Sequence, residues 1–450
     1  MASRQLNGGK KQLTQDLVQS ALQAGAEAAD AVVFESNSLE TSHRLGKLED
    51  VERSESQDLG LRVFIGKQQA SVSTTDTSKA ALTLLVERAV AMAKAAPEDP
   101  YCGLAPAELL ATEFPDLDLI DNTEVTTEDL AKLSLEAEEA ALGETGITNS
   151  EGASASWGRD SVALATSEGF AGSFSDTGFS VSCAVLAGKG LDMQVGHESH
   201  STCHRSDMQS PAEVGKTAAE RALKALGPRK VKSQAVPVVY EDRLASSLVG
   251  HFARAILGTG VARKTTFLKD KMGEQLFADY IWIVDDPHRH RGLSSKPFDG
   301  EGVRNKALNL IEQGRLTTWL LDTASARQLG LQTTGHAGRG TGGPPSPSWT
   351  NLYMKPGNLS PKDLINDIKQ GLFVNSMFGP SINSTTGDYS VGVSGIWIEN
   401  GELAHPVNEI TIAGNLIDMF RNLTPANDLK FRYGTNAPTI RVEGMTVAGA

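Results

Sequence analysis

The feature that most constrains the fold is a change of pattern near the middle of the chain. Before residue 228, segments with apolar residues three and four positions apart, typical of amphipathic helices, alternate with segments in which every second residue is apolar, as in strands. After residue 280 the sequence is mostly strand-like, and the short basic and polar segment 228–233 separates the two patterns. We therefore expect an α+β fold in two parts: a helix-and-strand domain over residues 1–227, and a mainly antiparallel β domain over residues 233–450.

Residues with strong positional preferences mark several element boundaries. Ser210–Gly227 begins with a capping serine, a proline and an acid, and ends on glycine, which makes it the clearest helix. Ser360–Gly371 has a similar start and predicts one helix inserted among strands. Asn400-Gly401 predicts a type I′ hairpin. Other helices are expected over residues 11–29, 78–97, 126–143 and 241–257, and strands over residues 31–36, 60–65, 69–75, 155–167, 179–187 and 235–240.

Charge and cysteine content narrow the function classes. The chain has 42 Lys and Arg against 55 Asp and Glu, a net charge of −13, and no long basic run, which argues against direct nucleic-acid binding. No apolar stretch is long enough for a membrane-spanning helix, and the start MASRQLNGGKKQLTQDL lacks the apolar centre of a signal peptide. Three cysteines without a C-x-x-C pair fit a reducing compartment. These features predict a cytoplasmic protein without a membrane anchor.

Two segments are candidates for special chemistry. HESHSTCH, residues 197–204, gathers His, Glu and Cys, which are metal donors, but it lies between a strand and a helix, so a polar strand end is the alternative interpretation. The segment Gly335–Gly343 has five glycines in nine residues and predicts a loop, either a mobile lid or a rigid irregular edge. Its glycine spacing is a weak match to a phosphate loop, because it does not open a helix.

One stretch of sequence resembles a known family. The resemblance is strongest over residues 299–423, in FDGEGVRNKALNLIEQGRLTTWLLDTASARQLGLQTTGHAGRG, PSWTNLYMKPG, STTGDYSVGVSGIWIENGELAHPV and ITIAGNLIDMF, and it extends weakly over nearly the whole chain, including DLGLRVFIGKQQASVSTTD. In their order and spacing these segments are similar to the TldD/PmbA family. The resemblance implies a cytoplasmic metallopeptidase assembled from two chain types, of which one carries H-E-x-x-x-H on a helix and a late cysteine as zinc ligands.

The zinc ligands of that family have no counterpart here. In the helix expected over residues 241–257, Val249, Gly250 and Arg254 stand where the resemblance would place His, Glu and His. Val and Gly carry no donor, and Arg is a permanent cation that repels Zn²⁺. The segment 424–439 has no cysteine. The resemblance therefore implies the zinc-free chain type, PmbA or TldE, with no cofactor and no catalytic residue of its own and with zinc in the partner subunit.

This comparison implies a function and leaves two alternatives. We expect a non-catalytic subunit of a metallopeptidase that degrades or processes unfolded or small peptides, working with a TldD-like metal-bearing subunit and forming a homodimer when isolated. One alternative is a regulatory or binding protein of the gyrase-modulator type, without a role in proteolysis. The other is a self-sufficient metalloenzyme that uses the His197–His204 cluster.

Candidate peptide-binding residues lie in the stretch of strongest resemblance. Glycine lets a substrate backbone approach closely, and Asn and Thr offer both donors and acceptors to main-chain groups. The alternative is that these are only turn residues. The candidates are Thr334, Gly335, Asn351, Thr386, Gly387 and Asp388.

Overall fold

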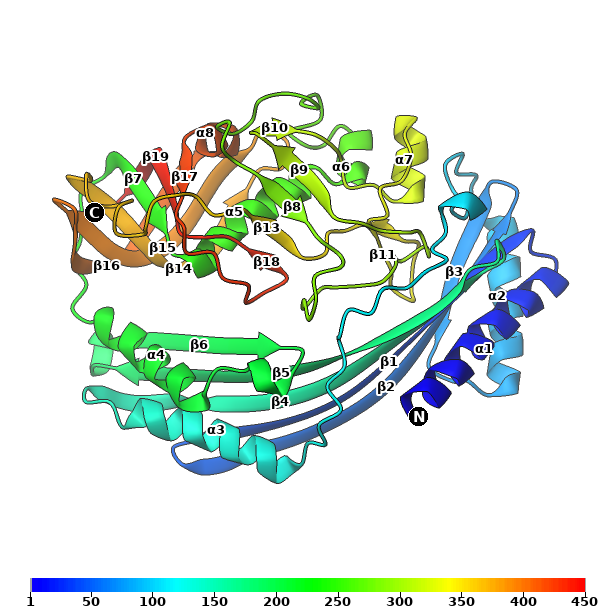
Figure 1. The fold of residues 1–450 in the computed structure, drawn as a ribbon, viewed down its shortest axis with the longest axis horizontal. Helices are drawn as coiled ribbons and strands as arrows, with labels where there is room; N and C mark the ends of the chain where they lie inside the picture. Colours follow the sequence, from blue (N-terminus) through cyan, green and yellow to red (C-terminus); the bar gives the residue numbers. More distant parts are fainter. Residues whose placement is uncertain (1, 450) are drawn as a thin grey trace.

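A long curved antiparallel sheet carries most of the first half of the chain (Figure 1). The computed structural model describes residues 2–449, with side chains from residue 8 onward. The sheet has the order β3-β2-β1-β4-β5-β6. Its strands are β1 (Ala28–Arg44), β2 (Lys47–Ile65), β3 (Gln68–Thr74), β4 (Ile147–Thr166), β5 (Ala171–Ala187) and β6 (Gln194–Thr202).

Four helices cover the convex face of this sheet (Figure 1): α1 (Ala2–Gln23), α2 (Lys79–Ala95), α3 (Thr127–Leu142) and α4 (Pro211–Lys224). Val181, Cys183 and Val185, at alternate positions of β5, are buried and pack in one cluster with residues of α3 and α4. Gly215 lets α4 come close to α3, since a Cβ there would lie 1.9 Å from the Ala137 carbonyl oxygen. One side of β5 is thus buried under helices, whereas residues 47–56 of β2 are exposed on both faces.

The concave face of the sheet is divided into two regions. Near α1 and α2, Val32 and Leu164 pack against Phe298 and Val303 from the second half of the chain, on the same face as the buried ion pair of Asp30 with Arg62. Farther along, the same face carries small polar side chains that are half-buried. Serine hydroxyls pair there across the strands, with Ser154 Oγ 3.0 Å from Ser182 Oγ and Ser180 Oγ 3.0 Å from Ser201 Oγ.

The second half is mainly β-structure, folded inside the curve of the long sheet (Figure 1). Its larger sheet has the order β16-β15-β14-β7-β19-β17, and a further pairing of β16 with β19 closes five of these strands into a ring. The strands are β7 (Gln234–Tyr240), β14 (Gln370–Ile382), β15 (Asp388–Glu399), β16 (Glu402–Asn415), β17 (Leu423–Pro425) and β19 (Ile440–Ala448).

A smaller sheet, β10-β9-β8-β13-β18, lies beside this ring and shares its apolar core. Its strands are β8 (Ile283–Asp285), β9 (Leu308–Glu312), β10 (Arg315–Leu316), β13 (Leu352–Met354) and β18 (Thr435–Asn436). The remaining elements are β11 (Ala337–Gly338), β12 (Ser346–Pro347), α5 (Asp242–Ala255), α6 (Gly258–Ala262), α7 (Thr323–Leu329), α8 (Leu416–Arg421) and three short 3₁₀ turns at Ala107–Leu109, Gly190–Asp192 and Arg205–Asp207.

The α+β class predicted from the sequence is confirmed, but two of the predicted helices differ. The helix expected over residues 11–29 ends at Gln23, because Gly25 adopts a φ of +100° and Ala28 already begins β1. The helix expected over Ser360–Gly371 is wrong. Ser360 and Asp363 form the reciprocal capping contacts, but a series of turns follows and Gly371 lies in β14. A capping box marks where a helix can start and does not supply the apolar face that sustains it.

Candidate functional site

A cleft lies between the concave face of the long sheet and the β-rich half of the chain. It has a volume of 650 Å³, and both halves contribute to its walls. The sheet wall includes Phe34 and Ser36 of β1, Ser56 and Asp58 of β2, Asp160 and Val162 of β4, and Phe174 and Asp176 of β5. The facing wall is formed by residues 293–296 together with Ser348 and Trp349.

The sheet wall carries two aspartates that repel each other. Asp160 of β4 and Asp176 of β5 are direct cross-strand partners and so lie side by side on one face. Burial, and secondly the charge of Asp160, raises the pKa of Asp176 to about 6. No ion pair neutralises either carboxylate among the residues that the structure describes. Acidic groups left unpaired in a concavity are typical of functional sites rather than of structural cores.

The facing wall is cationic and aromatic. Lys296 lines the cleft, and burial lowers its pKa even though Asp299 and Asp285 oppose the effect. The Trp349 indole donates a hydrogen bond through Nε1 to Thr435 Oγ1 at 3.1 Å, which fixes the orientation of the ring. The guanidinium of Arg254, on α5, lies over that ring, 5.9 Å from its centre.

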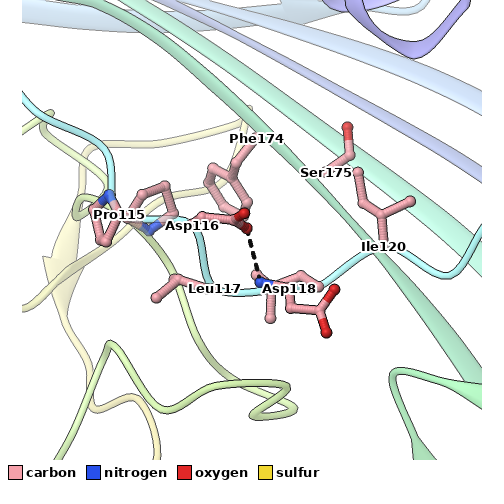
Figure 2. A pocket seen from close by; sticks show the side chains of 9 residues that line it. Pro115, Asp116, Leu117, Asp118, Ile120, Phe174 and Ser175 are labelled. Atoms are coloured by element: carbon pink, nitrogen blue, oxygen red, sulfur yellow. Dashed lines mark hydrogen bonds between the residues drawn. The ribbon is translucent and has the colours of Figure 1, made fainter.

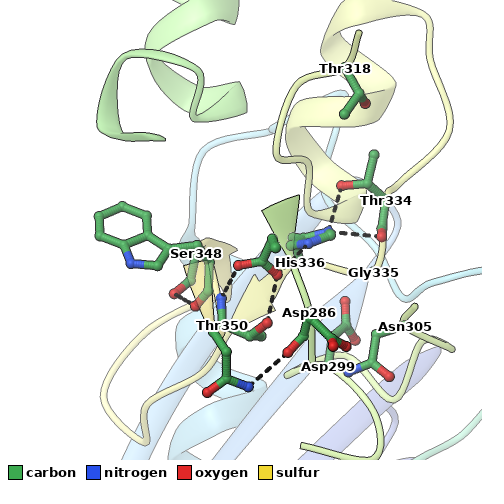
Figure 3. Close-up of polar contacts among 12 residues, drawn as sticks. Asp286, Asp299, Asn305, Thr318, Thr334, Gly335, His336, Ser348 and Thr350 are labelled. Carbon is green, nitrogen blue, oxygen red and sulfur yellow. Dashed lines mark hydrogen bonds and ion pairs between the residues drawn. The ribbon is translucent and has the colours of Figure 1, made fainter. Parts of the chain in front are cut away.

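A buried polar network behind this wall holds its segments in place (Figure 3). The Asp285 carboxylate accepts hydrogen bonds from the Thr350 backbone N–H at 2.7 Å and from Thr350 Oγ1 at 2.6 Å, and it lies 3.1 Å from His336 Nε2. His336 Nδ1 in turn lies 2.9 Å from the Thr334 carbonyl oxygen. Asn351 Nδ2 donates to the Asp286 carbonyl oxygen at 2.7 Å. The network ties residues 334–336 and 350–351 to the end of β8.

Three of the six predicted peptide-binding residues meet at this network. Thr334 also lines a separate cavity of 540 Å³. Gly335 has a φ of +71°, and a Cβ there would lie 2.7 Å from the Arg304 carbonyl oxygen. The Asn351 side chain is buried and bonds within the protein. None of the three is among the residues that line the 650 Å³ cleft.

The other three predicted residues form an exposed turn between β14 and β15. Thr386 Oγ1 donates to Asp388 Oδ2 at 2.6 Å, and Asn415 Nδ2 donates to the Thr386 carbonyl oxygen at 3.0 Å. Gly387 lies against Phe267. Within residues 2–449, no hydrogen bond connects this turn to the network around Asp285. The structure therefore separates the six candidates into two groups.

The glycine-rich segment Gly335–Gly343 is packed against the long sheet. Arg339 Nη1 donates to Asp30 Oδ2 at 3.1 Å, and Arg62 Nε donates to the same oxygen at 2.9 Å. Burial raises the pKa of Asp30, but the charges of Arg339 and Arg62 outweigh it and leave that pKa below its usual value. Gly60 of β2 lets the segment approach, since a Cβ there would lie 2.6 Å from the Thr341 carbonyl oxygen. Of the two interpretations of the loop, these contacts favour the rigid edge.

A second cavity adjoins the cleft at Phe174 (Figure 2). It has a volume of 320 Å³ and is lined mainly by the connecting segment 115–120. The backbone N–H of Thr177 donates to the Leu119 carbonyl oxygen at 2.9 Å, and that of Arg291 donates to the Leu117 carbonyl oxygen at 2.9 Å. The Arg291 side chain also pairs with Asp118 at 2.6 Å. The connecting segment thus bridges β5 and the β-rich half beside the cleft.

The donor sets singled out in the sequence do not fit a metal ion. On α5, Val249 is buried in the core, Gly250 has no side chain, and Arg254 is a cation. In the part of the chain that the structure describes, no group of three His, Cys, Asp or Glu is placed to hold a metal.

Several side chains of HESHSTCH, on β6 and in the turn after it, bond to different neighbours. Glu198 pairs with Arg221 at 2.9 Å, and His200 Nδ1 accepts a hydrogen bond from the Gln209 backbone N–H at 3.2 Å. His204 Nε2 donates to the Asp118 carbonyl oxygen at 2.8 Å. Burial, as the largest cause, raises the pKa of the Cys203 thiol to about 11, which keeps it protonated at neutral pH. Because neighbouring residues of a strand point to opposite faces, these donors do not converge.

The residues that line the cleft were not predicted from the sequence. One signal was present, because Asp160 and Asp176 lie in the middle of long strands, where aspartate is disfavoured. An aspartate in such a position is expected where a strand faces a cavity. Lys296 and Trp349 lie outside the named strands and helices, and their segments gave no comparable signal.

Comparison with known proteins gives consistent matches along the chain. Models described as PmbA/TldA metallopeptidase domain 1, central domain and C-terminal domain match residues 29–93, 120–226 and 233–449. Metalloprotease PmbA of Escherichia coli O157:H7 is 36% identical over 445 residues, which are 98% of this chain and 97% of that protein. A metalloprotease PmbA homolog of Haemophilus influenzae is 36% identical over 96% of this chain and 94% of its own length.

Solved structures share the fold. A protein of Bacteroides thetaiotaomicron described as a putative modulator of DNA gyrase superposes with a TM-score of 0.90 at 26% identity, over 98% of this chain and 99% of that chain. TldE of Thermococcus kodakarensis superposes with a TM-score of 0.85 at 19% identity, over 97% of this chain and 100% of that chain. No helix in the described range 2–449 has the length and apolar content needed to span a membrane.

Proposed function

The chain belongs to the PmbA/TldD metallopeptidase family, and from this premise we propose that it is a zinc-free, non-catalytic subunit that supplies one wall of a peptide cleft. The observation that carries the proposal is the absence of metal donors at three positions of α5. The positions where the family resemblance places His, Glu and His hold Val249 in the core, Gly250 and the cation Arg254. These residues do not fit a metal ion.

The character of the cleft supports a binding role. Its sheet wall combines the phenyl rings of Phe34 and Phe174 with serine hydroxyls, which both donate and accept hydrogen bonds. An extended peptide has a donor and an acceptor on nearly every residue and places side chains alternately on two sides. A wall of this kind suits many peptide sequences, because serine hydroxyls can bond to main-chain groups, which every peptide carries.

The proposed assembly joins this chain to a TldD-like metal-bearing subunit in the cytoplasm, where the pair acts on unfolded or small peptides. The metal and the attacking water belong to the partner. We propose that the six residues Thr334, Gly335, Asn351, Thr386, Gly387 and Asp388 act at the rim or in support of the wall, since none of them lines the cleft itself. We also propose residues 1–227 and 233–450 as the two domains, and a homodimer as the state of the isolated chain.

Mixing the purified chain with a metal-bearing family member tests the proposal. We expect the chain alone to hold no stoichiometric zinc by elemental analysis and to leave a fluorogenic peptide intact, and we expect hydrolysis when the two chains are combined. About one zinc per chain, lost on His197→Ala and His200→Ala, would instead establish a self-sufficient metalloenzyme. Hydrolysis by the partner at the same rate without this chain would favour a regulatory or binding role.

A further inference from the structure

We propose that the cavity beside Thr334 binds a small organic anion, whose carboxylate or phosphate group lies between the side chains of Arg304 and Lys306. This cavity has a volume of 540 Å³ and lies where the connecting segment around Leu109 meets the β-rich half. It shares no lining residue with the peptide cleft, so the inference does not rest on the proposed peptide-binding function. Pockets of several hundred Å³ are typical of sites for small molecules.

The two cations come from one short segment and line the same cavity. Because they are two positions apart in the sequence, their Cα atoms lie within about 7 Å of each other. Asn305 (Figure 3), between them, anchors the segment. Its Nδ2 donates to the Lys296 carbonyl oxygen at 3.0 Å, and its Oδ1 lies 2.7 Å from His288 Nε2. One anionic group in the cavity can therefore bond to both cationic side chains.

Arg304 is positioned but not neutralised. Its Nη2 donates to the Glu108 carbonyl oxygen at 3.1 Å, and its backbone N–H donates to the Leu109 carbonyl oxygen at 3.0 Å. Within the described residues 8–449, Arg304 makes no ion pair, so its remaining side-chain N–H groups are available to a ligand. Lys306 is exposed, and its ammonium has neither a hydrogen bond nor an ion pair in that range. Both cations thus lack an anionic partner.

The lining of the cavity contains no carboxylate that would compete with a ligand. None of the described lining residues is an Asp or Glu, although the whole chain has 55 acidic residues against 42 Lys and Arg. The acids nearest in the sequence, Asp299 and Glu301, are buried and bond elsewhere. Asp299 Oδ1 accepts the Val303 backbone N–H at 2.8 Å, and Glu301 Oε2 accepts the Thr323 hydroxyl at 2.6 Å. The cavity is therefore positively charged and attracts anions.

The rest of the lining favours an anion with an apolar body over a bare inorganic ion. Leu109, Val303 and Leu308 are apolar residues of the lining. The Gln332 side chain has no hydrogen-bond partner within residues 8–449, and its amide can donate to the ligand or accept from it. Two cations beside an apolar surface suit a molecule with one acidic group, either a carboxylic acid or a phosphate monoester.

Calorimetric titration of the full chain in a phosphate-free buffer tests the site with three probes of similar size: benzoate, phenyl phosphate and the uncharged benzyl alcohol. We expect at least one anion to bind about tenfold more tightly than the alcohol, as for one charge-assisted hydrogen bond. The tighter of the two anions identifies the acidic group. Arg304→Gln and Lys306→Gln should each remove most of this preference. Arg88→Gln and Lys79→Gln, at exposed positions of α2 without ion pairs, should not.

Three results would overturn the proposal. Equal binding of the anions and the alcohol would show that the cavity does not select charge. A preference for anions that both Arg304→Gln and Lys306→Gln retain would place the anion elsewhere, and binding of none of the probes would exclude the site. Melting temperatures equal to wild type verify that the variants are folded. If Arg304→Gln unfolds because it loses the Glu108 contact, Lys306→Gln still tests the site, since its side chain has no polar contact within residues 8–449 to lose.

Discussion

Asp30 and Asp176 lie on the same concave face of the long sheet, but their surroundings differ. Asp30 is buried and bonded to Arg62 and Arg339, and its pKa lies below the usual value. Asp176 has no cationic partner within the described residues, faces Asp160, and has a pKa raised to about 6. The Asp30 carboxylate joins the two halves of the chain, whereas the Asp176 carboxylate has no such partner among the described residues and stays available to a ligand. In the proposed function, one sheet face thus serves assembly at one end and binding at the other.

Asp30→Asn should show the largest effect. It leaves Arg62 and Arg339 buried without their anion, which costs about 3–5 kcal/mol of unfolding free energy at pH 7. Because the pKa of Asp30 is lowered, its contribution is complete above the unfolded value of 3.8 and is lost as pH falls through the folded value. Urea unfolding measures this loss. Asp58→Asn, in the cleft, should cost less than about 0.5 kcal/mol, and equal losses in the two variants would contradict the division of the face.

Two glycine substitutions test the same difference between the two ends of the concave face. An added Cβ at Gly60 would meet the Thr341 backbone at 2.6 Å, whereas at Gly178 of β5 it would meet no atom within 4 Å. We expect Gly60→Ala to destabilise the fold by roughly 1–3 kcal/mol through overpacking. Gly178→Ala should be neutral within about 0.5 kcal/mol. Chemical denaturation of both variants measures the two effects, and a loss at Gly178 would mean that the space beside this part of β5 is filled.

Asp176→Asn should stabilise the protein, and by a smaller amount. The rise of its pKa from 3.8 to about 6 corresponds to at most about 3 kcal/mol, and solvent in the cleft reduces this to roughly 1–2 kcal/mol at pH 8. An acid whose folded pKa is raised destabilises the fold at high pH, and that penalty disappears as pH falls through 6 toward 3.8. The advantage of Asp176→Asn should therefore shrink over this range in melting experiments. An advantage independent of pH would show that charge is not its cause.

Local signals predicted much of the fold. Alternating apolar residues marked the parts of each strand that lie under helices, such as Val181 to Val185, and the capping signals of α4 set its start. The full lengths of β1 and β2 were missed. Beyond residue 36 their concave face carries serines and acids, and strand alternation cannot be recognised when both faces are polar.

The candidate site was predicted less well, because it is formed by contacts between distant parts of the chain. Asp160 and Trp349 are 189 positions apart in the sequence numbering and line one cleft. The glycines at 335 and 387 suggested places of close approach, but each meets a neighbour within the protein. The sequence alone did show that Val249, Gly250 and Arg254 on α5 carry no metal donor, since that conclusion needs only the identity of the residues.

In the proposed pair, this chain contributes a binding wall and no chemistry. Steady-state kinetics of the mixture with a metal-bearing partner test it most directly, with Trp349→Ala and the double variant Asp160→Asn/Asp176→Asn in this chain. We predict that both variants raise KM severalfold and leave kcat near the wild-type value, because they remove contacts that bind the peptide equally in the ground state and the transition state. Loss of kcat with unchanged KM, or hydrolysis by this chain without its partner, would contradict the claim.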